Sequence, residues 1–195
     1  MSLSALLSLL ENHAVRAEAG AEAAMLAEYA PFIRAHPDCL WRTCLSGHLT
    51  ASAWVVDPAR RHTLLTHHRK LDRWLQLGGH ADGQADLLAA AAREAREESG
   101  LAEVRPVGAG IFDVDRHRIP ARGAEPEHWH YDVRFLFEAD PAEPLKVSGE
   151  SKELAWVELG RVAALNPGES LARMGRKTRR QPEQGIGPGA RAGGA

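Results

Sequence analysis

Apolar residues near the start of the chain recur with the spacing of helices. Between residues 4 and about 35, leucine, alanine and aromatic side chains return every three or four positions, which places them on one helix face. We expect two helices separated near Gly20, the second ending at the His36-Pro37-Asp38 turn. After residue 47 the pattern changes to that of strands. The chain is therefore expected to begin with a helical extension over residues 1–46.

The next segment contains short apolar runs that are typical of strands. In the clearest of them, Val133 and Phe135 alternate with Asp132 and Arg134, so that one face is apolar and the other polar. Turn residues such as Asp57-Pro58 separate these runs. Strands are predicted over residues 48–56, 63–67, 74–77, 107–114, 130–138 and 153–159.

Residues 86–99, within the strand-rich region, have helical periodicity instead. Leu88, Ala91 and Ala95 form an apolar stripe, and Gly100 provides a stop signal after the last turn. A shorter helix is predicted over residues 162–165. The pattern indicates one domain of mixed helices and strands over residues 47–174.

The last part of the chain offers almost nothing to bury. Beyond about Gly175 it consists mainly of arginine, glutamine, glycine, proline and alanine. Such a segment cannot offset the entropy lost on ordering. We therefore expect a disordered basic and glycine-rich tail over residues 175–195.

Composition and charge narrow the class of protein. The chain has 195 residues, and its 26 acidic and 24 basic side chains give a formal net charge of −2, which does not suggest a nucleic-acid or membrane-surface protein. Cys39 and Cys44 are interpreted as reduced core thiols. There is neither a run of ~20 apolar residues nor a basic signal-peptide start. We expect a cytoplasmic protein without membrane or stable nucleic-acid partners; association as a homodimer is left open.

Three glutamates lie at helical spacing in the second half of the segment 86–99. Glu94, Glu97 and Glu98 project from one helix face, away from the apolar stripe. Carboxylates this close repel one another unless a cation lies among them. Mg²⁺ suits such a place because it binds through a few carboxylates, waters and substrate phosphates. The alternative is a solvated acidic helix end, with Arg93 and Glu97 as an ion pair.

The spacing around these glutamates resembles the Nudix box, a 23-residue glycine-to-helix signature of the Nudix hydrolase superfamily. The matching positions are Gly79, Arg93, Glu94, Glu97, Glu98, Gly100 and Leu101. The resemblance implies an α+β protein, an α/β/α sandwich around a mixed sheet, with the N-terminal helices added to it. It also implies hydrolysis of a diphosphate linkage in a nucleoside diphosphate joined to another group, with Mg²⁺ or Mn²⁺ as cofactor and a small-molecule diphosphate as substrate.

The resemblance also implies a role for each matching residue. Gly79 would form the turn that brings the loop onto the helix. Arg93 would orient Glu94 or its neighbours through a charge-assisted hydrogen bond. Glu97 and Glu98 would be the main metal ligands, with Glu94 as a further ligand or as part of water activation.

One position departs from the family's pattern. A glutamate is expected six residues after Gly79, where this chain has Ala85 followed by Asp86. Asp86 is better suited to cap the helix N-terminus. Weaker catalysis, or a binding module without catalysis, is the alternative that this departure raises.

Histidines outside the box resemble the metal site of another branch of the superfamily, isopentenyl-diphosphate isomerase. His48 begins a strand, His80 follows two glycines, and His130 and Asp132 share one face of a later strand. The resemblance implies a second metal, Zn²⁺ or Mn²⁺, and the alternative is that these side chains line a substrate pocket. Isomerase chemistry is the runner-up function, although Gly78 stands where that enzyme has a cysteine that protonates the substrate.

A general base is expected from a loop after the box. Glu150 is the first candidate, because Ser148-Gly149-Glu150 has the composition of a flexible loop near the pocket. The other candidates are Glu153, Glu125 and Glu127. The alternative is a solvated loop glutamate without a catalytic role.

Overall fold

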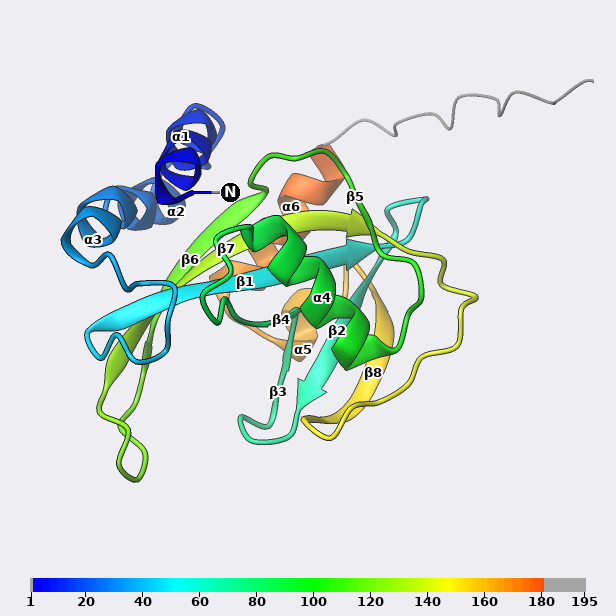
Figure 1. Cartoon of the computed structure of the whole chain (residues 1–195). Coiled ribbons are helices and arrows are strands. Elements are labelled where there is room, and N and C mark those ends of the chain that lie inside the picture. The colour runs from blue at the N-terminus through cyan, green and yellow to red at the C-terminus, as the bar shows by residue number, and fades with distance from the viewer. Residues whose placement is uncertain (1, 181–195) are drawn as a thin grey trace, which may run out of the picture.

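Eight strands form one mixed sheet in the computed structural model, which describes residues 2–180 (Figure 1). The strands are β1 (Gly47–Val56), β2 (His62–His68), β3 (Arg73–Leu75), β4 (Leu77–His80), β5 (Arg105–Pro106), β6 (Asp113–Ile119), β7 (His128–Glu138) and β8 (Ser151–Glu158). The helices are α1 (Leu3–Ala14), α2 (Ala21–Leu26), α3 (Tyr29–Ala35), α4 (Leu87–Ser99), α5 (Val162–Leu165) and α6 (Glu169–Arg180).

β1 lies at the centre of the sheet. It runs parallel to β7 from the pair Gly47↔Trp129 to the pair Val56↔Glu138. Its other edge pairs antiparallel with β4 near its start and with β2 at its end. β6 pairs antiparallel with β7, and β8 with β2. The sheet is therefore mixed, as the sequence predicted.

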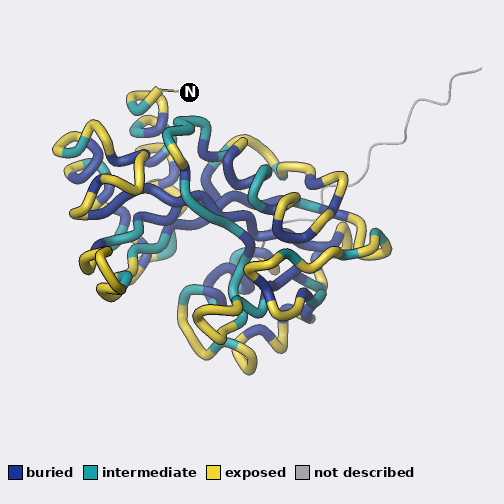
Figure 2. The backbone as a smooth tube through the Cα atoms, turned by 60° about the horizontal axis from the view of Figure 1, so that its bottom comes forward, coloured by how far each residue is buried: buried dark blue, intermediate teal, exposed yellow. Residues whose placement is uncertain are grey.

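Alternation along β1 divides the hydrophobic core into two layers. Leu49, Ala51 and Ala53 pack toward the cluster that contains the α4 stripe and the N-terminal helices. Trp54 and Val56 pack into a second cluster with α5 and α6. Figure 1 shows α4 in front of the sheet and α5 and α6 behind it, and Figure 2 shows buried backbone through the middle of the molecule. This is the expected α/β/α sandwich.

The N-terminal extension contributes to the first of these layers. Phe32 stacks on Tyr131 of β7 with ring centroids 3.9 Å apart, and Tyr29 meets the same ring edge-on at 5.2 Å. The break near Gly20 is confirmed, since this residue precedes α2 with a φ of 94°. The extension has three helices where two were predicted, because a second break separates α2 from α3.

The loop after α3 contacts the segment that leads into α4. The Gly83 amide donates a hydrogen bond to the Leu40 carbonyl over 3.0 Å. Gly83 has a φ of +82°, and a Cβ at this position would overlap the ring of Trp41. The N-terminal extension is therefore in contact with the loop that precedes α4, the helix that carries the three glutamates.

Two of the strand predictions are wrong in detail. Residues 107–112, expected as part of a strand, are irregular, and β6 begins only at Asp113, where it pairs with Arg134. Gly108, with a φ of +80°, and Gly110 interrupt this apolar run. The expected strand over 74–77 is divided between β3 and β4, which pair with different neighbours.

The prediction of a disordered tail from residue 175 is wrong for residues 175–180, which complete α6; residues 181–195 lie outside the described part of the chain. The helix is anchored by ion pairs as well as by Leu171 and Met174, which are buried in the second core layer. Arg173 donates to both oxygens of the buried Asp113 carboxylate over 2.8 Å, and the Lys177 ammonium lies 3.0 Å from the same carboxylate. The side chain of Thr178 is fully buried as well.

The expectations for the cysteines are confirmed, since Cys39 and Cys44 are both buried free thiols. Burial raises the pKa of the Cys39 thiol to about 11, which keeps it protonated. Within residues 2–180, no helix combines the length and apolarity that a membrane span requires.

Replacing Thr178 by valine is expected to lower the free energy of unfolding by about 1–3 kcal/mol. The Trp54 indole N–H donates to the Thr178 hydroxyl over 2.8 Å in the second core layer and would lose this acceptor. The measurement is urea denaturation. Arg179→Gln changes the exposed neighbour and is expected to stay within about 0.5 kcal/mol of wild type. Equal transition midpoints for the two variants would contradict the prediction.

Candidate active site

α4 is placed by its two caps and its apolar stripe. Asp86 caps the N-terminus, as predicted, by accepting a hydrogen bond from the Ala89 amide over 3.2 Å. Gly100 ends the helix with a φ of 73°, the left-handed conformation that glycine adopts readily. Ala91 and Ala95 are fully buried in the first core layer. This packing turns the glutamates of α4 toward β4.

Glu94 lies directly against Gly79. A Cβ at residue 79 would come within 2.5 Å of the Glu94 carboxylate. The predicted turn role of Gly79 is wrong, because this residue belongs to β4 and pairs with Ala51. The Glu94 carboxylate occupies the space that a side chain at residue 79 would fill, so a larger residue there would have to displace this carboxylate.

Glu98 is the most deeply buried of the three glutamates, with 7% of the residue exposed. Its carboxylate accepts a hydrogen bond from the Gly78 amide over 3.0 Å. Burial raises the pKa of Glu98 to about 7, and the nearby Glu94 and Glu150 carboxylates act in the same direction. Burial also raises the pKa of Glu94, against the opposing effect of Arg93. Both carboxylates are thus held where negative charge is unfavourable.

Arg93 bridges the other two glutamates. Its Nη1 lies 2.8 Å from the Glu94 carboxylate and 3.1 Å from that of Glu97, and its Nη2 donates to the His80 carbonyl over 3.4 Å. The Glu97 side chain is 60% exposed. Among the described residues, the three glutamates do not form a group with metal-sized separations. Glu94 and Glu98 point inward, whereas Glu97 lies at the outer rim beside Arg93.

Glu150 is the loop glutamate that was expected to act as general base. It is exposed, and its carboxylate is close enough to raise the pKa of Glu98. The Glu150 carbonyl accepts a hydrogen bond from the Arg69 amide over 2.8 Å, which attaches this loop to the end of β2. The loop candidate and the helix glutamates are therefore neighbours.

Asp132 does not join the histidines with which it was grouped in the sequence. Its buried carboxylate accepts hydrogen bonds from the Thr50 and Ser52 hydroxyls over 2.9 and 2.8 Å. The Arg134 Nε lies 2.7 Å from the same carboxylate. Asp132 was predicted to belong to a second metal site or pocket, and the metal interpretation is not supported, because these donors and the Arg134 charge already satisfy it.

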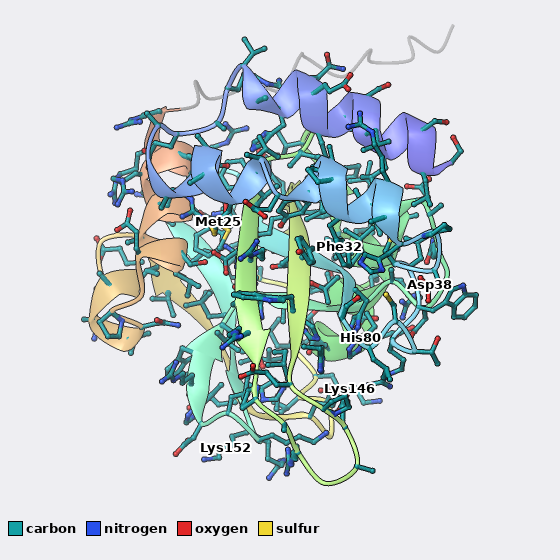
Figure 3. The ribbon with its side chains drawn as sticks, turned by 90° about the vertical axis from the view of Figure 1, so that its left-hand side faces the viewer. Met25, Phe32, Asp38, His80, Lys146 and Lys152 are labelled. Atoms are coloured by element: carbon teal, nitrogen blue, oxygen red, sulfur yellow. The ribbon has the colours of Figure 1, made fainter. Side chains whose placement is uncertain are left out.

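Four histidines do come together at the beginning of β1 and β7. The His48 ring centroid lies 5.0 Å from that of His80, 4.7 Å from that of His130 and 4.9 Å from that of His128. His80 lies on the same side of the molecule as the loop that carries Asp38 (Figure 3). His128 was not predicted as part of this group, although it stands two residues before His130 and so shares its strand face.

Burial favours the neutral form of three of these imidazoles, those of His48, His80 and His130. It lowers the pKa of His48 to about 4, with the neighbouring His80 and His128 acting in the same direction. The pKa values of His80 and His130 are also lowered, chiefly by burial. Each neutral ring therefore retains one nitrogen lone pair.

Comparison with a protein-family model identifies the family. Residues 47–176, more than half of the chain, match the NUDIX domain. The chain therefore belongs to the Nudix family. A comparison with curated proteins finds no match.

Solved structures share the fold at low sequence identity. An Ap4A hydrolase of C. elegans is 18% identical over 67% of this chain and 95% of its own, with a TM-score of 0.52. The E. coli dihydroneopterin triphosphate pyrophosphohydrolase is 15% identical over 66% of this chain and 92% of its own, with a TM-score of 0.54. At these identities the likeness establishes the fold.

The metal-free protein is expected to lose stability as the pH rises through the pKa of Glu98. The folded-state pKa of about 7 exceeds the ordinary value of 4.5, so the contribution is fully present below about pH 4.5 and is lost by about pH 7. Relative to Glu98→Gln, the wild type should lose on the order of 3 kcal/mol of unfolding free energy across this range. Urea denaturation at several pH values in the presence of a chelator measures this. Parallel pH profiles for the two proteins would contradict it.

Proposed function

We propose that this Nudix chain is a divalent-metal-dependent pyrophosphohydrolase that cleaves a diphosphate linkage in a nucleoside diphosphate joined to another group. The observation that carries the proposal is the pair of inward carboxylates on α4. Glu94 and Glu98 are held against Gly79 and the Gly78 amide, where burial raises the pKa of both. A cation would relieve this unfavourable charge.

The donors available at this position fit Mg²⁺ or Mn²⁺. Glu94 and Glu98 would supply carboxylate oxygens from the inner side, and Glu97 would supply a third from the outer rim. When bound, such an ion neutralises the diphosphate and lowers the pKa of a coordinated water. Arg93, released from Glu97, would keep Glu94 oriented through their 2.8 Å contact.

In this proposal Glu150 serves as the general base. The attacking water gives a proton to the Glu150 carboxylate, its oxygen forms a bond to one phosphorus, and the bridging P–O bond breaks. The exposed position of Glu150 in a loop next to Glu98 supports this role, because the carboxylate can reach a water molecule beside the box glutamates.

Packing around Gly78 argues against the isomerase alternative. A Cβ at this position would lie 2.5 Å from the Ser52 hydroxyl and 2.7 Å from the Ala51 carbonyl oxygen. A cysteine could not be accommodated there without moving the backbone of β1. The thiol on which isomerase chemistry depends is thus absent from this position, and the packing leaves no space for one.

A hydrolysis screen in which the products are separated by chromatography is the direct test of the proposed activity, because cleavage of the diphosphate linkage gives two phosphorylated products. The two solved relatives are named for Ap4A and for dihydroneopterin triphosphate, which suggests a panel of dinucleoside polyphosphates, nucleotide sugars and nucleoside triphosphates. With Mg²⁺ or Mn²⁺, the wild type should hydrolyse at least one compound, and Glu97→Gln should reduce kcat by about a hundredfold or more, because a metal ligand is lost. Glu103→Gln, an exposed glutamate beyond α4, is the matched control. Wild-type activity no higher than that of Glu97→Gln across the panel would favour a binding module.

Glu150→Gln is expected to lower kcat by about 10²–10⁴-fold while leaving substrate and metal affinity nearly unchanged, since only the proton acceptor is removed. Steady-state kinetics over a range of pH provides the measurement, and the variant should lose the acidic limb of the wild-type profile. Glu153→Gln, an exposed glutamate on β8, is the control. Turnover by Glu150→Gln at the wild-type rate would remove Glu150 from the mechanism.

A further inference from the structure

Three imidazoles from two strands offer ring nitrogens within the range of a common ion. Potential ligand atoms of His48, His128 and His130 all lie within 4.8 Å of one another. The parallel register places His48 directly beside His130, and the side chains of His128 and His130 lie on the same face of β7. The group therefore rests on strand pairing and not on flexible loops.

The hydrogen bonding of His128 sets its tautomer. Its Nδ1 lies 2.9 Å from the Pro126 carbonyl oxygen, and because a carbonyl only accepts, this nitrogen must carry the proton. The lone pair is then on Nε2, which faces the Nε2 of His130 at 3.3 Å. Metal-binding histidines commonly show this arrangement, in which one ring nitrogen donates to a backbone carbonyl and the other is free to coordinate.

His48 is buried without a polar partner. The residue is 1% exposed, and neither of its ring nitrogens has a hydrogen-bond partner within residues 2–180. A buried ring with no partner for either nitrogen is costly. The ring nevertheless lies among three other histidines, at distances where coordination to a shared ion would satisfy it.

The separations match the geometry of a tetrahedral site. Zn–N bonds of about 2.0–2.1 Å place neighbouring ligand atoms roughly 3.4 Å apart. The 3.3 Å between the His128 and His130 nitrogens is already at this value. The wider separations, up to 4.8 Å, would close by rotation of the rings.

We propose that His48, His128 and His130 form a binding site for a borderline transition-metal ion, Zn²⁺ in the first place, separate from the carboxylate site of α4. Imidazole ligands favour Zn²⁺ and its neighbours in the series over Mg²⁺, which prefers oxygen. Three histidines leave the fourth tetrahedral position to water or substrate. This set differs from the one suggested by the isomerase resemblance, because it includes His128 and excludes His80 and Asp132.

Two charged side chains, those of Glu125 and Arg42, act on the histidine cluster. The Glu125 carboxylate lies 4.0 Å from the His128 Nε2, and its charge also acts on His80. Arg42, from the N-terminal extension, acts on the pKa of both His48 and His80 and supplies positive charge at the rim. One acidic and one basic side chain therefore act on the histidine cluster.

Metal uptake by the full chain tests the proposal. Protein freed of metal with a chelator is dialysed against Zn²⁺ in excess Mg²⁺, metal content is measured by mass spectrometry, and Co²⁺ serves as an absorption probe of tetrahedral geometry. The wild type should bind one Zn²⁺ per chain. His128→Gln and His130→Gln should each weaken Zn²⁺ binding by at least roughly tenfold.

Three control variants make the result specific. His62→Gln alters a histidine of β2 that lies outside the cluster, and His36→Gln disables the other metal-sized group in the described chain, formed by His36, Asp38 and Cys44. Both should bind Zn²⁺ like the wild type. Glu98→Gln should also retain Zn²⁺, which separates this site from the proposed hydrolase metal.

Several outcomes would overturn the proposal. These are wild-type Zn²⁺ affinity in both His128→Gln and His130→Gln, loss of Zn²⁺ in His36→Gln instead, and no Zn²⁺ uptake by the wild type. If the cluster variants fail to fold, as judged by circular dichroism, histidine-ring NMR of the wild type replaces them. Added Zn²⁺ should then shift the ring signals of three histidines, and unchanged ring signals would end the idea.

Discussion

The parallel pairing of β1 with β7 determines where the central polar groups of the molecule lie. Its register sets His48 beside His130 and Thr50 beside Asp132, so the polar side chains of both strands share one face. Leu49, Ala51 and Ala53 of β1 lie on the other face, on which α4 packs. A slip of one residue would exchange the two faces, taking the histidines and Asp132 into the alanine-rich layer under α4. Both the fold and the polar groups thus depend on one register.

The short strand β4 connects the two sets of chemical groups. Its glycines face opposite sides, since Gly79 leaves room for Glu94 while Gly78 lies against Ser52. His80, at the end of the same strand, belongs to the histidine cluster and also accepts a hydrogen bond from Arg93 through its carbonyl. Two glycines and a histidine therefore set the carboxylates of α4 at a fixed separation from the imidazoles of β1 and β7.

Local patterns in the sequence predicted most elements, but not the way in which polar groups would pair. The helix expected over 86–99 is found as Leu87–Ser99 with its predicted caps, because both the stripe and the caps are local features. The helical part of residues 175–180 was missed because its contacts are long-range, from Lys177 to Asp113 and from Thr178 to Trp54. Strand alternation correctly placed Asp132 on the face of His130. It could not reveal that Arg134 and two hydroxyls would engage this carboxylate, leaving His128 beside the other histidines.

The contact between the N-terminal loop and the loop before α4 affects where the boundary of the folded domain lies. The family match begins at residue 47, yet the Leu40 carbonyl and the Trp41 ring close around Gly83, inside the family's own signature segment. The segment that matches the family model is therefore shorter than the segment that packs together as one unit. Exchanging residues 81–86 for those of another family member would replace this part of the motif but leave Leu40 and Trp41, which pack against it, unchanged. In a chimaera made with this chain, the junction would have to lie before the N-terminal extension. That boundary is set by packing contacts and not by sequence similarity.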